Sequence, residues 1–275
     1  RFDCEHGRWM FKRQRLSDHE PYDTLSFRGV VEHSSNIGMA KASLRMPGSE
    51  LRTFYERFGF GSTTGLETLE ERGGGFSDLE GNDVDRLWST FGYGVNVTAV
   101  QLASAVGAIA NDGVLVPPRL LRGLRTADGT WQPRPRPEPR RVVSTATART
   151  LTSILEGVVE RGTGSHAAVP GFRVAGKTGT TRRHTTGKGY TAKTYVASFA
   201  GFAPSDDPRA ALVVVVYSPQ SSIYGGAIAA PTFSRIMTDT LAHLRVPAAG
   251  SDVVLLPDRG APHGARAAST AGGSP

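Results

Sequence analysis

Hydrophobic and polar residues follow helical patterns in the first 160 residues of the chain. Helical composition or spacing predicts helices over residues 28–46, 50–58, 99–112 and 145–162. The clearest is 99–112, because Thr98 and Gln101 form a T-x-x-Q capping box before an apolar run and Gly113 supplies a stop. Ser49 and Ser144 are the expected N-cap residues of the second and fourth helices. This part of the chain is therefore predicted to be mainly helical.

The pattern changes to that of β-strands after residue 171. Strands are predicted over residues 172–180, 194–204 and 209–219. Four turn-forming residues, 205–208, separate the last two strands, so we expect an antiparallel hairpin. A final helix is predicted over residues 229–244. Helices followed by adjacent strands and a last helix indicate an α+β fold, with helices flanking an antiparallel sheet.

The remaining segments lack these patterns. Residues 1–27 show no assignable period, and the proline-rich stretch 131–141 is expected to be an exposed connector. From Pro247 onward the chain is rich in Gly, Ala, Pro and Ser, and such a composition cannot bury a core. We therefore expect one folded unit over residues 1–246 and a disordered tail over residues 247–275.

Composition narrows the classes of partner. The 275 residues are 39% hydrophobic and 21% charged, which suits a globular domain. The 32 Lys and Arg residues exceed the 25 Asp and Glu residues by seven, but no Lys/Arg run carries interleaved aromatics, so nucleic acid is not an expected partner. The chain has one cysteine, Cys4, and no Cys/His cluster pattern, so no metal or other cofactor is expected.

Membrane attachment is not expected from these residues themselves. No apolar run reaches the ~18 residues that a spanning helix requires. The chain opens at Arg1 rather than at a methionine, and we expect it to be a piece of a longer protein whose anchor lies elsewhere.

Residues 171–178 match the phosphate-binding pattern G-x-x-x-x-G-K-[ST]. That loop requires a buried strand before it and a helix that starts at its lysine, because the helix N-terminus holds the phosphates. The segment before Gly171 reads RGTGSHAAVP, which is not strand-like, and Gly179 with several threonines argues against a helix after Lys177. The four residues between the glycines are themselves strand-like. A nucleotide-binding loop is therefore disfavoured.

A different function is expected if the same residues form a β-strand. Alternation places Lys177 and Gly179 on one face and Thr178 on the other. An edge strand with a cation, hydroxyl groups and free backbone N–H groups suits a peptide that lies beside it and ends in a carboxylate. A solvent-facing strand with incidental polar residues is the alternative interpretation.

Two ordered motifs connect this strand with the N-terminal helices. Ser34-Ser35-Asn36 is an S-x-N triplet, and Lys177-Thr178-Gly179 follows it as K-T-G. With their flanking stretches FRGVVEHSSNIGMAK, FGYGVNVTAVQLASAVGAIANDGVLVPPRL, RTLTSILEGVVERGTG, VAGKTGT and YVASFAGFAP, they make residues 24–245 resemble class B penicillin-binding proteins, the cell-division and elongation transpeptidases. A serine in the middle of S-x-N is similar to these transpeptidases and departs from class A β-lactamases. The resemblance implies a serine β-lactamase/transpeptidase-like fold whose N-terminal part is missing.

The family's nucleophilic serine, in S-x-x-K, has no match in this chain. No serine is followed by a lysine three residues later, and Lys41 is seven residues beyond Ser34, or ~10 Å along a helix. We expect that the chain begins after this motif; a degenerate homologue without a nucleophile is the other explanation. In either case the 275 residues alone are predicted not to acylate.

The resemblance implies a peptidoglycan D,D-transpeptidase. In such an enzyme a serine attacks the penultimate D-Ala carbonyl of a stem peptide, and an amine from a neighbouring strand resolves the acyl-enzyme. Ser34 would relay a proton to the leaving nitrogen. Asn36 would hydrogen-bond the substrate amide and help to hold the missing lysine. Lys177 would hydrogen-bond Ser34 and supply positive potential near the substrate carboxylate.

Three further residues are implied as the substrate-binding set. Thr178 and Thr180 would bind the substrate carboxylate, and the Thr180 N–H would form half of the oxyanion hole. Gly179 would allow the substrate to approach. The nucleophile's own N–H, which this chain lacks, would form the other half of the hole.

Other polar residues near the motifs are expected to have ordinary roles. Ser35 is expected to be a buried helix serine that bonds back to a carbonyl. Lys41 is predicted to be solvated, and His33 and His184 are predicted to be surface histidines. The cations Arg182, Arg183 and Lys188 are expected in a solvated loop, although binding of wall polymer there stays open.

Two other functions remain alternatives. One is a non-catalytic module that recognises peptidoglycan or β-lactams, and the other is a serine β-lactamase or sensor. The resemblance implies stem peptides ending in D-Ala-D-Ala and β-lactams as ligands, and other cell-wall synthesis or division proteins as partners. It also implies the extracytoplasmic face of the bacterial cytoplasmic membrane as the location.

Overall fold

The computed structural model describes residues 1–68, 70–183 and 194–248. The helices among these residues are α1 (Phe27–Glu32), α2 (Asn36–Ser43), α3 (Gly48–Arg57), α4 (Asp83–Ser89), α5 (Ala99–Ala110), α6 (Thr145–Glu160) and α7 (Gly225–His243), with 3-10 turns η1 (Glu5–Gly7) and η2 (Ser165–Ala167). The strands are β1 (Phe2–Asp3), β2 (Arg8–Phe11), β3 (Gln14–Ser17), β4 (Thr24–Leu25), β5 (Gly75–Phe76), β6 (Val95–Asn96), β7 (Val114–Leu115), β8 (Gly123–Arg125), β9 (Trp131–Pro133), β10 (Arg140–Arg141), β11 (Ala175–Arg182), β12 (Tyr195–Ala203) and β13 (Ala210–Tyr217).

The largest sheet has the order β11-β12-β13 and is antiparallel throughout. The expected hairpin is therefore confirmed, with Ala203 opposite Ala210 across the turn. The first strand begins at Ala175 rather than at residue 172, because Gly171 adopts φ +78° and Phe172 pairs with Val169 in a separate bridge. β11 lies at one edge of this sheet, as the sequence predicted.

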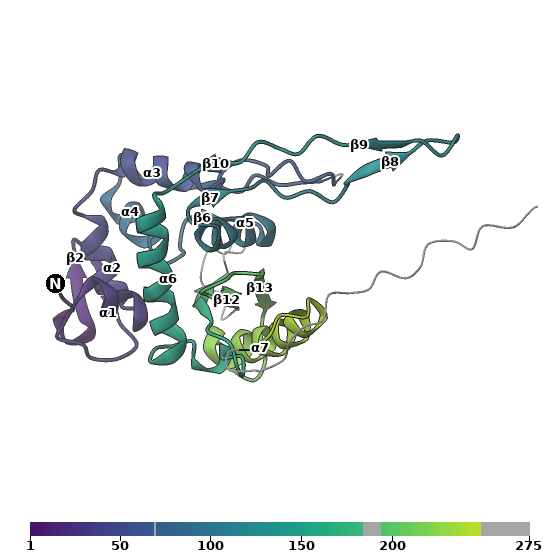
Figure 1. Ribbon diagram of the computed structural model, residues 1–275. Coiled ribbons are helices and arrows are strands. Elements are labelled where there is room, and N and C mark those ends of the chain that lie inside the picture. Colours follow the sequence, from purple (N-terminus) through teal and green to yellow (C-terminus); the bar gives the residue numbers. More distant parts are fainter. Residues whose placement is uncertain (69, 184–193, 249–275) are drawn as a thin grey trace, which may run out of the picture.

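Helices pack on both faces of the sheet (Figure 1). On one face Phe199 of β12 packs against Phe233 of α7, with ring centroids 4.7 Å apart. On the other face Phe202 packs in a cluster with Val106 of α5 and Val158 of α6. Both strand phenylalanines are fully buried, so β12 is the centre of the core and β11 is held rigidly beside it.

Two of the predicted caps are confirmed. Thr98 and Gln101 form both bonds of the capping box at α5, and Ser144 accepts a hydrogen bond from Thr147 at the start of α6. The cap predicted for the second helix is wrong: α3 begins at Gly48 after Pro47, and Ser49 lies inside its first turn. Pro47 occupies the N-cap position with an extended backbone, and its ring offers no side-chain acceptor, so α3 begins without a side-chain cap.

The last helix begins earlier than expected, at Gly225 rather than at residue 229. Its first two residues are glycines, which allow the helix start to approach the sheet closely. A Cβ at position 225 would lie under 3.0 Å from the carbonyl oxygens of Ser198 and Gly179. Tertiary packing therefore selects glycine at a helix start that a pattern of propensities does not reveal.

The helix predicted over residues 28–46 is two helices, α1 and α2, separated at Ser34. Ser34 has φ +58°, and its N–H donates to Val31 O while that of Ser35 donates to Val30 O. These are the two bonds of a Schellman motif, which ends a helix. Ser35 then caps α2 by accepting a hydrogen bond from the N–H of Gly38. The break turns Ser34 away from the helix axis and exposes its side chain.

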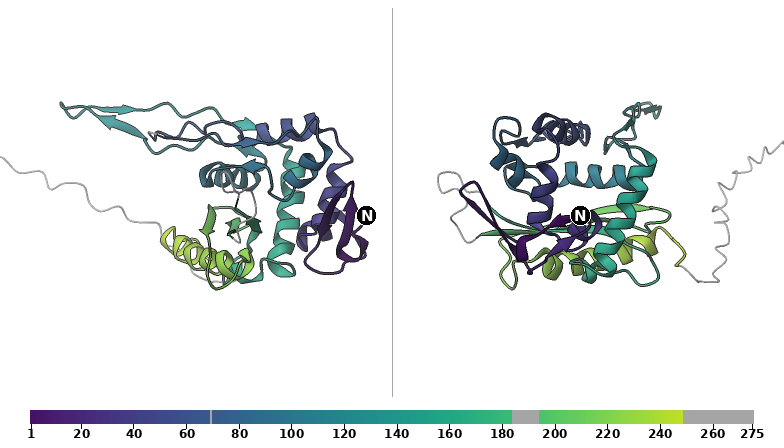
Figure 2. Two further views of the ribbon diagram at one scale, coloured as in Figure 1. Left: turned by 180° about the vertical axis from the view of Figure 1, so that it is seen from behind. Right: turned by 90° about the vertical axis from the view of Figure 1, so that its left-hand side faces the viewer.

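The N-terminal residues and the proline-rich stretch form small sheets. Within residues 1–27, β1 pairs with β4, and β2 and β3 form a hairpin. The stretch 131–141 contributes β9 and β10 and is exposed throughout, as expected of a connector, although β9 pairs with β8 in an arm that extends from the body (Figure 2). The tail predicted from residue 247 onward lies, after Ala248, outside the described residues.

Candidate active site

The structure brings Ser34 and Lys177 together although 143 residues separate them. Lys177 lies in β11, and its Nζ donates to Ser34 Oγ at 2.6 Å and to the carbonyl of Thr178 at 3.1 Å. Desolvation of the ammonium group lowers the pKa of Lys177 to about 8. A cation that is fixed and poorly solvated beside an exposed hydroxyl can attract an anion and can exchange a proton near neutral pH.

The backbone of Ser34 is strained. Left-handed φ in a residue with a side chain costs of order 1–3 kcal/mol, and such strain persists where the surroundings enforce it. Here it places the hydroxyl at the junction of α1 and α2, facing β11.

An aspartate secures the start of α2 beside this junction. Asp18 Oδ1 accepts from the N–H of Ile37 at 2.9 Å, and Ser35 Oγ donates to Asp18 Oδ2 at 2.5 Å. Burial raises the pKa of Asp18, and these hydrogen bonds oppose that rise. Ser35 is buried, but it caps the helix instead of bonding back to a carbonyl, so that expectation is wrong. Asn36, in the first turn, donates from Nδ2 to Ser17 O at 3.0 Å.

The other predicted binding residues lie along β11. Thr178 Oγ1 is 2.8 Å from Thr163 Oγ1, and Thr180 Oγ1 accepts from the N–H of Gly225 at 3.0 Å. Gly179 sits between them, where a Cβ would overlap Ser198 Oγ. Glycine at this position therefore lets the α7 start, β11 and β12 approach one another without a side chain between them.

Several neighbouring residues have other environments than expected. Lys41 is only partly exposed and is engaged by other groups: its Nζ is 2.6 Å from Glu5 Oε1 and 5.1 Å from the ring centroid of Trp9. His33 is half-buried, with its ring 5.1 Å from that of Tyr22, and is not an ordinary surface histidine. Arg182 ends β11 instead of lying in a loop.

Two of the predicted residues, His184 and Lys188, lie outside the described residues. Arg183 directly follows β11, and its N–H donates to Thr194 O at 2.8 Å.

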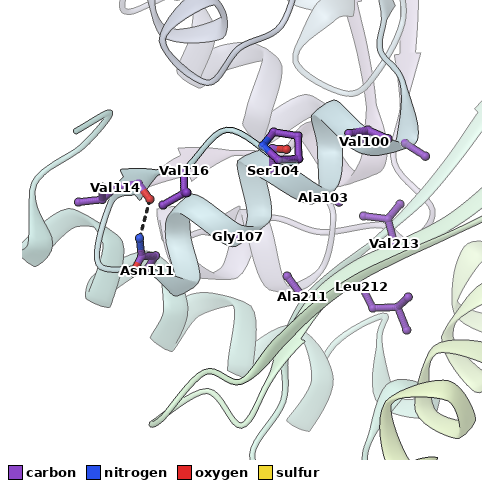
Figure 3. A pocket seen from close by; sticks show the side chains of 12 residues that line it. Val100, Ala103, Ser104, Gly107, Asn111, Val114, Val116, Ala211, Leu212 and Val213 are labelled. Atoms are coloured by element: carbon purple, nitrogen blue, oxygen red, sulfur yellow. Dashed lines mark hydrogen bonds between the residues drawn. The ribbon is translucent and has the colours of Figure 1, made fainter. Parts of the chain in front are cut away.

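A groove of about 630 Å³ opens beside Asn36. Its walls include the rings of Trp88, Phe91 and Tyr93 and, at its rim, Arg15 and Arg182. A second cavity of about 680 Å³ lies between α5 and β13, away from the predicted site residues (Figure 3). It is mainly apolar, and the Asn111 amide beside it is bonded to Val114 O. Of these two cavities, the first is the one that a predicted site residue, Asn36, lines.

The geometry does not support a nucleotide-binding loop. Gly176 and Lys177 lie inside an antiparallel strand, whereas that loop places its lysine at the start of a helix. Among residues 1–68, 70–183 and 194–248, no group of His, Cys, Asp or Glu side chains is arranged to hold a metal ion. Nor does any helix in these ranges have the length and apolar character to cross a membrane.

Comparison with known proteins decides the family. The model of the penicillin-binding protein transpeptidase domain matches residues 1–238. The chain belongs to this family. The expected class B relationship and the transpeptidase-like α+β fold are thereby confirmed, as is a D,D-transpeptidase domain at the level of the family.

The chain is similar to relatives named as peptidoglycan D,D-transpeptidases and penicillin-binding proteins. Peptidoglycan D,D-transpeptidase FtsI of Escherichia coli is 36% identical over 240 residues, which are 84% of this chain and 39% of FtsI. Penicillin-binding protein PbpB of Mycolicibacterium smegmatis is 36% identical over 255 residues, covering 88% of this chain and 38% of that protein. The chain thus spans about two fifths of the length of these relatives.

Solved structures of similar sequence share the fold. The transpeptidase domain of penicillin-binding protein 3 from Burkholderia pseudomallei has a TM-score of 0.78 and 35% identity, covering 90% of this chain and 73% of that one. The apo form of penicillin-binding protein 3 from Mycobacterium tuberculosis has a TM-score of 0.81 and 32% identity, covering 88% and 57%.

Sequence reasoning assigned no site role to Asp18 or Thr163, which contact the site, although Thr163 lies within one of the stretches that resemble the family. Asp18 lies in the N-terminal region without periodicity, and Thr163 lies in the turn after α6. Each is at least 15 residues from its partner, so neither contact follows from local spacing.

Proposed function

We propose that this chain is part of a peptidoglycan D,D-transpeptidase that cross-links stem peptides. The observation that carries the proposal is the 2.6 Å hydrogen bond from Lys177 to Ser34, at the edge strand that also presents Thr178, Gly179 and Thr180. The relatives named as D,D-transpeptidases support the same reaction.

The reaction is acyl transfer in two steps. A serine Oγ attacks the carbonyl of the penultimate D-Ala, an ester forms, the peptide C–N bond breaks, and the nitrogen leaves as D-Ala after taking a proton. An amine of a neighbouring peptide then attacks the ester, a new amide forms, and the serine regains its proton. The 275 residues contain no S-x-x-K, so the nucleophile is a serine outside them, and these residues alone do not acylate.

Ser34 and Lys177 move the proton in this proposal. Ser34 Oγ relays it to the leaving nitrogen, and Lys177 Nζ, already bonded to that oxygen, compensates the charge. Because desolvation lowers the pKa of Lys177 to about 8, the group is mainly cationic at neutral pH yet close to its titration range. Asn36 faces the adjoining groove, where it binds the substrate amide and the lysine of the absent motif.

The edge of β11 binds the substrate backbone and carboxylate. The hydroxyl groups of Thr178 and Thr180 bind the substrate carboxylate, and Lys177 supplies positive potential beside it. The N–H of Thr180 forms half of the oxyanion hole, and the nucleophile's N–H forms the other half. Gly179 leaves the strand edge open to the peptide.

The ligands and location follow from this reaction. The substrate is a stem peptide ending in D-Ala-D-Ala, and β-lactams react at the same centre; solved structures of the M. tuberculosis relative contain aztreonam and ampicillin. The reaction takes place at the extracytoplasmic face of the bacterial membrane, together with other cell-wall synthesis or division proteins.

Fluorescent penicillin labelling tests the proposal. We expect the protein as the cell produces it to become labelled, while the purified 275-residue chain does not. Lys177→Met and Ser34→Ala in the natural protein should slow labelling by about 10²- to 10⁴-fold, the range of a lost general acid or base. Lys12→Met is the matched control, because Lys12 is exposed and its Nζ contacts Asp83 and the ring of Phe11, neither of which has a proposed role in the reaction.

Two results would contradict the proposal. Labelling of the 275-residue chain itself would show that a nucleophile lies among these residues. Stoichiometric penicillin binding without a covalent adduct in the natural protein would favour the non-catalytic binding module, whereas rapid nitrocefin hydrolysis would favour a β-lactamase.

A further inference from the structure

The hydrogen-bond network around Lys177 extends to Thr163, a residue outside both motifs. Lys177 Nζ lies 2.6 Å from Ser34 Oγ and 3.4 Å from Thr178 Oγ1. On its other side, Thr178 Oγ1 is 2.8 Å from Thr163 Oγ1. One continuous series of polar groups therefore runs from the α1–α2 junction across β11 to the turn after α6.

We propose that Thr163 is a positioning residue that orients the hydroxyl of Thr178 toward the substrate carboxylate. This proposal rests on the proposed function, in which Thr178 binds that carboxylate. Thr163 contacts neither Ser34 nor Lys177 by a hydrogen bond in the described residues, so its effect passes through Thr178.

Counting donors and acceptors shows what Thr163 contributes. A threonine hydroxyl has one proton to donate and two positions that accept. Lys177 can only donate, so its contact occupies one accepting position of Thr178 Oγ1. When Thr163 donates to the second position, the single proton of Thr178 is left for the carboxylate. Without Thr163, the Thr178 side chain loses the partner that fixes its rotamer and its proton.

The position of Thr163 is enforced by its surroundings. A Cβ on Gly226, in the first turn of α7, would lie 2.5 Å from Thr163 O and 3.7 Å from Thr178 Cγ2. On the other side, a Cβ on Gly162 would collide with the carbonyl of Glu32 and the backbone of Val158. Glycines at both places let α6, α7 and β11 converge, and Thr163 cannot withdraw from Thr178 without moving a helix.

The convergence is completed by η2, directly after Thr163. The N–H of Gly164 donates to Val158 O at 2.9 Å, and His166 Nδ1 is 3.1 Å from Gly226 O. The turn is therefore tied to the end of α6 and to the start of α7. Thr163 is itself exposed, so its hydroxyl is held by the contact with Thr178 and by the tied turn rather than by burial.

The test compares Thr163→Val with Thr163→Ser in the protein as the cell produces it. Valine keeps the shape but loses the hydroxyl, whereas serine keeps the hydroxyl. The probes are benzylpenicillin and its methyl ester, which differ in the carboxylate that Thr178 is expected to bind. Acylation is followed at several probe concentrations, so that half-saturation and maximal rate are measured separately, and thermal melting checks that each variant is folded.

We expect Thr163→Val to lower the second-order rate of acylation by benzylpenicillin about 3- to 10-fold, the effect that loss of one net hydrogen bond supports. The loss should appear as a higher half-saturating concentration with an unchanged maximal rate. Acylation by the methyl ester should not change, and Thr163→Ser should restore the wild-type values for benzylpenicillin.

The outcomes separate this proposal from the function on which it rests. If Thr163→Val behaves like wild type, or slows both probes equally, or if Thr163→Ser is equally impaired while folded, the positioning role is overturned and the transpeptidase function stands. If the wild-type protein reacts with neither probe, both proposals are overturned.

Discussion

Replacing Gly225 by alanine tests how closely α7 must approach the candidate site. Gly225 is the first residue of α7, and its N–H donates to Thr180 Oγ1 at 3.0 Å. A Cβ at this position would lie under 3.0 Å from two backbone carbonyl oxygens, those of Ser198 in β12 and Gly179 in β11. Backbone atoms cannot rotate away, so the helix start must move from the sheet.

The magnitude follows from this geometry. Carbon atoms pack best at about 3.5–4.0 Å, so the start of α7 must withdraw by roughly 1 Å. Overpacking of this kind costs about 1–3 kcal/mol, and the Thr180 hydrogen bond, worth about 1 kcal/mol, is stretched. We therefore expect Gly225→Ala to lower the free energy of unfolding by about 1–4 kcal/mol and to slow penicillin acylation, because Thr180 moves with its partner.

Urea unfolding and fluorescent penicillin labelling measure the two effects. Gly107→Ala in α5 is the matched control, because no atom lies within 4 Å of a Cβ built there. In a helix interior that change should stabilise the protein by about 0.5–1 kcal/mol and leave labelling unchanged. An unfolding midpoint for Gly225→Ala at or above that of wild type, with unchanged labelling, would refute the close approach.

Two further predictions concern a buried amide and the site cation. Gln101 is buried, and its Nε2 donates to Ser62 O at 2.7 Å and to Gly73 O at 2.8 Å. Gln101→Ala should therefore lower the free energy of unfolding, measured by urea titration, by about 2–4 kcal/mol. A loss below about 0.5 kcal/mol would contradict this prediction. The pKa of Lys177 is about 8, so acylation that depends on its charge should fall as pH rises through about 8. In the Lys177→Arg variant the side chain stays charged at that pH, so the acylation rate should no longer decrease there. An identical pH profile in the wild-type and variant proteins would exclude Lys177 as the origin of the decrease.

The sign of the Lys177 effect on stability is opposite to its effect on the reaction. Its pKa is lower in the folded protein than in the unfolded chain, so the charged form disfavours folding. This unfavourable contribution is complete below pH about 8 and disappears as pH rises toward the ordinary lysine range. The charge on which the proposed reaction depends at neutral pH therefore reduces the stability of the fold.

Local patterns were sufficient for elements whose signals lie within a few residues. The capping box at Thr98 and Gln101 predicted α5 because both of its hydrogen bonds join residues three apart. The hairpin of β12 and β13 was predictable because a short turn leaves adjacent apolar strands few ways to pair. The S-x-N and K-T-G motifs likewise singled out Ser34 and Lys177 as candidate site residues, and the structure places them in contact.

The same patterns failed where distant contacts decide. The break at Ser34 requires a strained φ that its local sequence does not favour, and bonds from Ser35 to Asp18 and from Ser34 to Lys177 accompany it. The early start of α7 depends on the close approach of Gly225 to β11 and β12. Helix propensity disfavours glycine, so it does not predict a helix that begins there.

The sequence by itself thus determined the family and the α+β class and supplied the candidate site residues, because short ordered motifs and local periodicity carry this information. Only the tertiary structure decided how Ser34 reaches Lys177. It also decided that Asp18 bonds to Ser35 and that Thr163 bonds to Thr178 beside this pair. Those contacts join segments 15 to 143 residues apart, and their distances depend on how α6, α7 and β11 pack together rather than on any local pattern.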